Sequence, residues 1–108
     1  MEQLAITEKR GANYVLYELV GSVNSYTCGD LQEKIFEEIK GNNVVLDMSQ
    51  VIDIDSTGMG MLFASFNDGL ESGYKLYLMN MSFTALNRVK DTGFLEAFKV
   101  IQSVTEVE

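Results

Sequence analysis

The stretch from Val51 to Phe63, VIDIDSTGMGMLF, decides how this chain is interpreted, because it joins an apolar run to a helix-like pattern. Asp53 and Asp55 lie at the end of the apolar run, and Ser56 or Thr57 stands where a helix is expected to begin. Ser, Thr and Asp are preferred N-cap residues, because their oxygens accept hydrogen bonds from the unpaired N–H groups of the first turn. Helix capping alone is therefore one sufficient interpretation of these residues.

Two glycines in the same stretch favour a second interpretation. Gly58 and Gly60 fall in the first helical turn, where glycine costs roughly 1 kcal/mol relative to alanine. Close approach of another backbone or a ligand is the usual reason to keep a glycine there. A helix N-terminus tolerates a phosphate, which adds a charge of about −1.5 to −2. The site therefore also fits a phosphorylation switch on Ser56, with Thr57 as the rival acceptor, that makes an acidic docking face more repulsive.

The residues after this site fall into a helical pattern. Apolar side chains recur at Met59, Leu62, Phe63, Phe66 and Leu70. This spacing predicts a helix that ends at Gly73 and buries the face carrying those residues. Met61 falls on the opposite face, so we expect its side chain to be exposed. A single exposed apolar residue is ordinary, but a flexible thioether beside the site also suits protein docking, and we expect Met61 to contact a partner.

The rest of the chain alternates between strand and helix patterns. Two strands flank a turn at residues 9–13, and bulky residues on both faces of the second predict a strand covered on both sides. A helix begins near Thr27, ends at Gly41 and carries an apolar stripe at Leu31, Ile35, Phe36 and Ile39. Strands are expected at 43–49 and 74–81, then a helix from Ser82 to Gly93, and last a strand or short helix at 98–104.

This alternation predicts one α/β domain with an open mixed sheet of about five strands and three to four α-helices. Its 108 residues are enough for one domain. The net charge of −8 argues against binding to nucleic acid or to an anionic membrane surface. With Cys28 as the one cysteine and no histidine, we expect no disulfide, metal or cofactor. Cys28 is expected to pack at the start of its helix.

The location of the chain is predicted from the same residues. A single cysteine is typical of a reducing compartment. The first residues, MEQLAITEKRGANY, show no basic-then-apolar signal pattern. No apolar run approaches the roughly 18 residues of a membrane span. We therefore expect a cytoplasmic protein.

The stretch VVLDMSQVIDIDSTGMGMLF resembles the signature of the STAS domain, specifically that of the bacterial anti-sigma factor antagonists. That signature is an apolar strand with an Asp, a short loop, and then Asp-Ser-Ser/Thr-Gly-apolar-Gly opening a helix. The matching positions are Asp47, Asp55, Ser56, Thr57, Gly58, Met59 and Gly60. ELVGSVNSYTCGDLQEKI and GYKLYLMNMSFTALNRVKDTGF resemble flanking parts of the family. The resemblance spans nearly the whole chain and implies one STAS domain over residues 1–108.

The resemblance implies a regulatory protein rather than an enzyme. In this family the unphosphorylated protein binds an anti-sigma factor and so releases a sigma factor to RNA polymerase. The anti-sigma factor is often a kinase of the serine that follows the Asp, which is Ser56 here, and a PP2C-type phosphatase resets it. The family usually has Asp where this chain has Asn24, a position near the docking face. We expect a monomer when free, with partner contacts at Asn24, Asp53, Asp55, Ser56, Thr57, Gly58, Met59, Gly60 and Met61.

Two other functions remain open at this point. The first is a STAS domain that is never phosphorylated and serves as a scaffold or as a subunit of a larger signalling or transport assembly. The second is an enzyme with Ser56 as nucleophile beside Asp55, but the chain has no histidine to act as the usual base. The spacing of Gly58 and Gly60 is neither a dinucleotide-binding motif nor a P-loop. The sequence favours the phosphorylatable antagonist.

Overall fold

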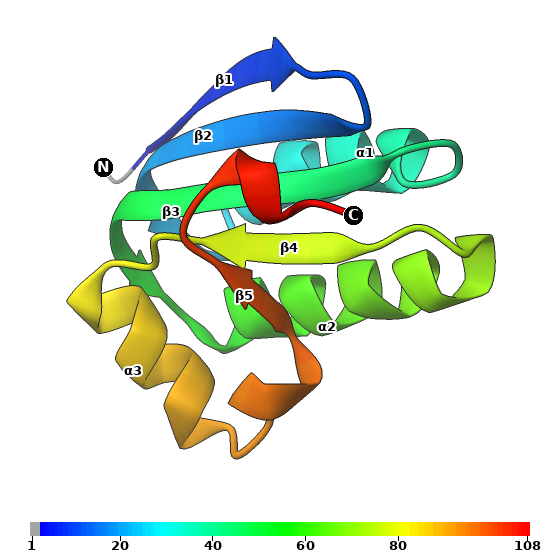
Figure 1. Ribbon diagram of the computed structural model, residues 1–108. Coiled ribbons are helices and arrows are strands. Elements are labelled where there is room, and N and C mark those ends of the chain that lie inside the picture. The colour runs from blue at the N-terminus through cyan, green and yellow to red at the C-terminus, as the bar shows by residue number, and fades with distance from the viewer. Residues whose placement is uncertain (1–2) are drawn as a thin grey trace.

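The computed structural model describes residues 3–108, which form one five-stranded sheet with helices packed against it (Figure 1). The strands are β1 (Leu4–Arg10), β2 (Tyr14–Val23), β3 (Asn43–Ile54), β4 (Leu76–Met79) and β5 (Lys99–Ile101). The α-helices of the described residues are α1 (Cys28–Glu38), α2 (Ser56–Ser72) and α3 (Phe83–Asp91), with short 3-10 helices η1 (Leu95–Ala97) and η2 (Val104–Glu106). The predicted α/β class and strand number are confirmed.

The sheet is mixed, as the sequence predicts. Its strand order is β1-β2-β3-β4-β5; β1 and β2 form an antiparallel hairpin, and the other neighbours pair in parallel. The parallel strands are joined through α1, α2 and α3, because parallel neighbours need a crossover connection. The strand predicted at 43–49 extends to Ile54, so β3 runs almost to the start of α2.

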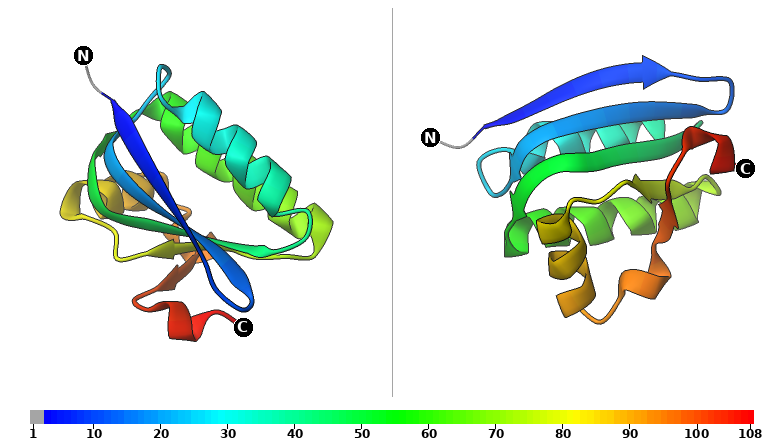
Figure 2. Two further views of the ribbon diagram at one scale, coloured as in Figure 1. Left: turned by 90° about the horizontal axis from the view of Figure 1, so that it is seen from above. Right: turned by 60° about the vertical axis from the view of Figure 1, so that its left-hand side comes forward.

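The two faces of the sheet carry two apolar clusters, so the prediction that β2 is covered on both sides is confirmed. Val15 and Tyr17 belong to the larger cluster, which also contains buried residues of all three α-helices. Leu16, between them, belongs to a smaller cluster on the other face with Ile101 and Val107. The C-terminal segment with η2 crosses the sheet on this second face (Figure 2). Both faces of the sheet are therefore covered along the first part of β3, where Val44, Val45 and Leu46 are buried, which suits an apolar run. Farther along β3, Ser49, Gln50 and Ile52 are exposed.

Helix α1 is shifted slightly from the predicted pattern. Thr27 occupies the N-cap position, but its side chain makes no capping hydrogen bond. Leu31 and Ile35 are buried as expected, whereas Phe36 is 45% exposed and lies under the ammonium group of Lys40, 4.2 Å from its ring centroid. The prediction that Phe36 belongs to the buried stripe is wrong, because the helix turns that position towards solvent.

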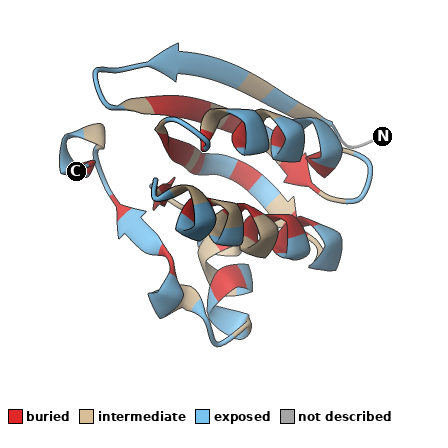
Figure 3. Cartoon of the chain, turned by 90° about the vertical axis from the view of Figure 1, so that its right-hand side faces the viewer, coloured by how far each residue is buried: buried red, intermediate tan, exposed pale blue. Residues whose placement is uncertain are grey.

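Helix α2 buries the predicted face only in part (Figure 3). Met59 and Leu62 are buried as expected, and Phe63 and Phe66 pack partly buried against the larger apolar cluster. Met61 is only 3% exposed and Leu70 is 67% exposed, so both predictions for these side chains are wrong. The buried side of α2 consists of Gly58, Met59, Met61, Leu62, Ser65 and Gly69. The small residues decide this orientation, because a Cβ at Gly69 would lie 3.0 Å from the Tyr74 carbonyl oxygen. The close contact between α2 and the residues beside it therefore decides which side of the helix is buried, more than the stripe of large apolar side chains does.

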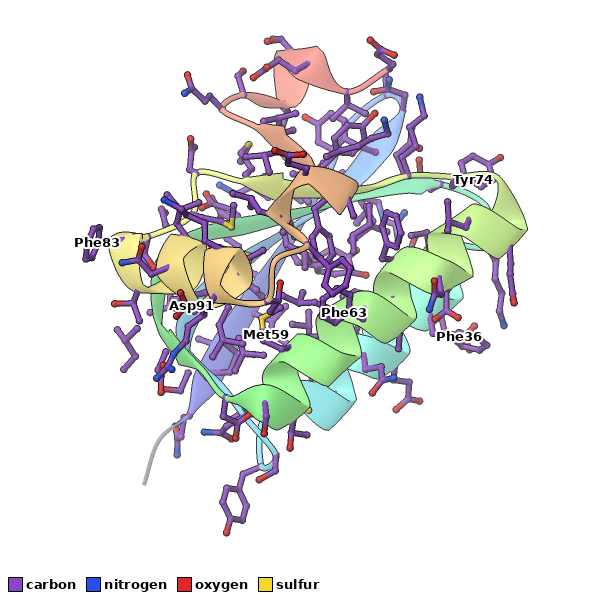
Figure 4. All side chains as sticks on the ribbon, turned by 90° about the horizontal axis from the view of Figure 1, so that it is seen from below. Phe36, Met59, Phe63, Tyr74, Phe83 and Asp91 are labelled. Carbon is purple, nitrogen blue, oxygen red and sulfur yellow. The ribbon has the colours of Figure 1, made fainter. Side chains whose placement is uncertain are left out.

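The two phenylalanines of α2 pack partly buried against the larger cluster and contact aromatic residues of the C-terminal part of the chain. Phe63 meets Phe94 and Phe98 with ring centroids 5.8 and 5.4 Å apart, and Phe66 meets Phe98 at 5.4 Å. Figure 4 shows Met59 and Phe63 on the side of α2 that faces α3 and η1. These contacts attach the segment before β5 to α2, with Phe98 itself part of the larger cluster.

Two of the predicted helix ends, Ser82 and Gly73, are confirmed, whereas α1 ends at Glu38, before the predicted stop at Gly41. Ser82 caps α3, since its hydroxyl accepts from Ala85 N–H at 3.1 Å and donates to the Val51 carbonyl at 2.6 Å. Gly73 caps α2 with φ of 85°, a left-handed conformation that favours glycine. Among residues 3–108, no helix has the length and apolarity needed to cross a membrane.

Candidate functional site

The start of α2 is capped by Asp55 and not by the hydroxyl residues that follow it. Asp55 has the extended backbone of an N-cap residue, and its Oδ1 accepts from Gly58 N–H at 2.8 Å. Ser56 and Thr57 are therefore the first two residues of the helix, and both are exposed. Because Asp55 satisfies the capping requirement, capping does not explain why hydroxyl side chains follow it.

The two glycines of the motif have different surroundings. A Cβ on Gly58 would lie 2.4 Å from the carbonyl oxygen of Val23, which also accepts from Asp55 N–H at 3.1 Å. Gly58 is thus required by the contact between α2 and the end of β2. A Cβ on Gly60 would meet nothing within 4 Å, and Gly60 is exposed with no left-handed backbone. The packing of the described residues therefore gives no reason for glycine at position 60.

The loop between β2 and α1 lies beside this helix start and is held by its own side chains. The Oδ1 atom of Asn24 accepts from Tyr26 N–H at 2.9 Å and from Thr27 N–H at 3.2 Å. Thr27 Oγ1 accepts from Asn24 N–H at 2.9 Å and donates to the Ser22 carbonyl at 2.7 Å. Asn24 therefore contributes the turn itself, which is a common role for an Asn side chain.

This loop and the strand end before α2 enclose an open hollow of about 590 Å³. It is lined by Ser22, Val23, Asn24, Ser25, Tyr26, Asp53 and Asp55. Three residues that the sequence assigned to partner binding, Asn24, Asp53 and Asp55, are thereby brought together. Ser56 follows directly at the beginning of α2. The predicted docking residues form one surface except for the two methionines and Gly58.

Those three exceptions belong to the core. Met61 lies in the apolar cluster between the sheet and the helices, and its sulfur accepts the Ser65 hydroxyl at 3.5 Å. The prediction that Met61 contacts a partner therefore loses its basis, because the side chain is not on the surface. Met59 and Gly58 are also buried. At the start of α2, the exposed surface is left to Ser56, Thr57 and Gly60.

The acidic rim is partly neutralised by a residue that sequence reasoning missed. Arg88 of α3 donates from Nε to Asp53 Oδ1 at 3.1 Å, with both side chains about half exposed. These residues are 35 positions apart, and no local spacing pairs them. The sequence shows only that Arg88 is a basic residue in the last turn of α3. Basic residues are common there because they interact favourably with the helix dipole. Asp53 is therefore part of an ion pair and not an isolated rim charge.

Cys28 lies at the first turn of α1, and the expectation that it is a packing residue is confirmed by its burial. Burial, and secondly the nearby Asp55 carboxylate, raises the pKa of the Cys28 thiol above its ordinary value. A raised pKa keeps the thiol protonated and poorly reactive at neutral pH. The effect of Asp55 also shows that the capping carboxylate lies close to the start of α1.

Comparison with known proteins defines the class. The model of the STAS domain matches residues 3–107, so the chain belongs to the STAS domain family. Solved structures with the same fold include a candidate anti-sigma factor antagonist from Thermotoga maritima, with a TM-score of 0.81, 19% identity, and 94% and 89% of the two chains covered. At such low identity the likeness shows the fold.

Two further similar structures come from different settings. One is the Bacillus cell fate determinant SpoIIAA in its phosphorylated form, with a TM-score of 0.73 and 18% identity over 94% of each chain. The other is SLC26A9, with a TM-score of 0.69 and 16% identity; the match covers 86% of this chain but 19% of that much longer one. The fold therefore occurs both as a stand-alone chain and as a part of a larger protein.

Proposed function

We propose that this protein is an anti-sigma factor antagonist whose binding is switched by phosphorylation of Ser56. The observation that carries the proposal is the exposed Ser56 hydroxyl at the first position of α2, left without a capping role because Asp55 performs it. In the unphosphorylated form, an anti-sigma factor docks on Ser56, Thr57, Gly60 and the adjoining hollow. When this protein binds the anti-sigma factor, the sigma factor is released to RNA polymerase.

The same partner acts as the serine kinase. The Ser56 Oγ attacks the γ-phosphorus of ATP, the bond from that phosphorus to the ADP oxygen breaks, and the hydroxyl proton passes to a base of the kinase. Exposed backbone at Gly60 gives the partner room to approach the helix. A PP2C-type phosphatase returns the hydroxyl by hydrolysing the phosphoserine with water.

The switch follows from electrostatics. A kinase that phosphorylates Ser56 must hold the phosphates of its nucleotide opposite this hydroxyl. Phosphoserine adds a charge of about −1.5 to −2 at that point, next to Asp55, so it repels the bound nucleotide. The helix N-terminus tolerates the added charge, and Ser56 is outside the core, so the fold is retained while docking is lost.

Phosphosite mapping tests the proposal. The protein is incubated with ATP and with each candidate anti-sigma factor kinase from its own genome, and the modified residue is identified by mass spectrometry. We expect phosphate on Ser56, none on the Ser56→Ala variant, and unchanged labelling of Thr57→Val. Phosphate on Thr57 alone would move the switch by one residue. No phosphate on either residue would favour the unphosphorylated scaffold or assembly subunit instead.

A further inference from the structure

The hollow beside the switch carries an exposed aromatic residue on a fixed loop. Tyr26 is 90% exposed, although its backbone N–H is held by Asn24 and its neighbour Thr27 is tied to both Asn24 and Ser22. The ring contributes almost no buried area to the fold. An aromatic side chain with two torsions on a rigid backbone loses little entropy on binding, which is why such residues anchor interfaces.

The walls of the hollow mainly accept hydrogen bonds. Asp53 and Asp55 contribute carboxylates, and none of the described residues that line the hollow is basic. Ser22 is 1% exposed, and its hydroxyl oxygen is buried with no hydrogen-bond partner among residues 3–108. Ser22 pairs with Asp53 in the register of β2 and β3, so the two side chains point to the same face of the sheet. Buried polar groups normally have partners, so the wall has an unused polar group.

We propose that this hollow binds an arginine side chain of the docked partner. A guanidinium group is planar and carries five N–H donors, so it can stack on the Tyr26 ring while donating to the carboxylates. Asp53 already accepts one guanidinium N–H, that of Arg88 at 3.1 Å, from outside the lining. The net charge of −8 attracts a cationic group. A lysine ammonium is a point charge that cannot stack in this way, so it fits less well.

The arginine subsite and the phosphorylation site have separate roles. Ser56 is not among the residues that line the hollow. Phosphate on Ser56 repels the nucleotide phosphates that the kinase holds opposite it, whereas the hollow anchors a cationic side chain beyond Asp55. The inference rests on the proposed function only in taking the arginine from the docked partner, because the hollow itself can be tested with a small probe.

The test is a titration of the full chain, labelled with nitrogen-15, with N-acetyl-arginine methylamide, followed by NMR. We expect the largest amide shifts at residues 22–27 and 53–55. Replacing Tyr26 by Ala should lower the affinity for the probe by about two- to fivefold, which corresponds to the loss of an exposed cation–π contact. Tyr26→Phe should retain the stacking and bind nearly as well. The matched control is Tyr74→Ala, an exposed tyrosine outside the hollow, which should bind like the unmodified protein.

A second acidic surface serves as an internal control. A depression beside α1 has five acidic lining residues and one basic one, Lys34, and the one aromatic residue of its lining, Tyr17, is buried. The acidic residues are Glu8, Asp30, Glu33, Glu37 and Glu38. If the arginine probe shifts the amide signals of this surface as strongly as those of the hollow, charge alone attracts the probe and the inference is wrong. The same conclusion follows if N-acetyl-lysine methylamide binds the hollow as tightly as the arginine probe does. An unchanged affinity in Tyr26→Ala would overturn it as well.

The probe experiment and the proposed function fail in different ways. If the anti-sigma factor does not bind the unmodified protein, the proposed function is wrong, whatever the probe does. If the partner binds but Tyr26→Ala and Tyr26→Phe both keep full partner affinity, the proposed function stands and the arginine subsite is wrong. Melting temperatures near that of the unmodified protein are expected for both variants, since the ring is in solvent.

Discussion

The buried side and the exposed first turn of α2 are governed by different requirements. On the buried side, Gly58 and Gly69 are small because backbone or side-chain atoms lie 2.4 to 3.1 Å from where a Cβ would be. On the exposed side near the start of α2, Gly60 has open space around it and Ser56 is exposed. The buried residues are explained by the fold, whereas the exposed ones require a partner. Residues of one short motif thus divide into structural and functional groups.

The largest expected effect comes from charging the buried side. Met61→Glu places a carboxylate in the apolar cluster with no cation to pair it, which should cost at least about 3 kcal/mol of unfolding free energy. Leu70→Glu is the matched control, because Leu70 is in solvent; its effect should stay within about 0.5 kcal/mol. Urea denaturation measures both. Equal losses would mean that α2 does not bury the side described above.

The two glycines provide the next contrast. Gly58→Ala forces a Cβ against the Val23 carbonyl, and overpacking of this kind costs about 1–3 kcal/mol. Gly60→Ala should instead stabilise the helix by about 0.5–1 kcal/mol, because alanine is the better helix former. Thermal denaturation gives the stabilities, and a pull-down gives partner binding. If Gly60→Ala binds the partner as well as the unmodified protein, the exposed backbone at this position is not a docking surface.

The motif was predictable because its residues act locally. Helix-start chemistry and glycine frequency indicated the beginning of α2 and the candidate acceptor Ser56, and strand and helix periods indicated the sheet. The burial of Met59 and Leu62 was predicted correctly, whereas the predictions for Met61 and Leu70 were wrong, because periodicity places the large apolar residues of one stripe inside. In the folded chain, neighbouring atoms leave no room for a Cβ at Gly58 and little at Gly69, so these positions lie on the buried side, and Leu70 is turned outwards.

Long-range features of the site could not be predicted. The pairing of Arg88 with Asp53 depends on where α3 packs against β3, which no local pattern encodes. The exposure of Tyr26 depends on the turn built by Asn24, a residue for which the sequence predicts a partner contact. A tyrosine in a short loop is as compatible with burial as with exposure.

Replacement of the N-cap residue Asp55 separates its structural role in α2 from its charge in the hollow. Asp55→Ala loses the hydrogen bond to Gly58 N–H, which should cost about 1 kcal/mol. Asp55→Asn keeps a capping oxygen and should retain most of that stability, while removing one charge from the hollow. Chemical denaturation measures the cap, and the arginine probe measures the charge. Equal stability of Asp55→Ala and the unmodified protein would show that another residue caps the helix.

The smallest effect is expected at Cys28. Burial is the main cause of its raised pKa and the Asp55 carboxylate is the second, so Asp55→Asn should lower the thiol pKa while leaving it above its ordinary value. Since thiolate is the reactive form, the pH profile of iodoacetamide alkylation should move to lower pH in the variant. An unmoved profile would mean that Asp55 does not reach the start of α1 electrostatically.

The central claim is tested most directly by the affinity of one partner for two forms of this chain. Isothermal titration calorimetry should compare the anti-sigma factor, loaded with nucleotide, against the unmodified protein and against the protein phosphorylated on Ser56, with circular dichroism confirming that both are folded. The account predicts tight binding by the unmodified protein and at least about a hundredfold weaker binding by the phosphorylated one, a coupling of about 3 kcal/mol. Equal affinities of two folded forms would contradict it.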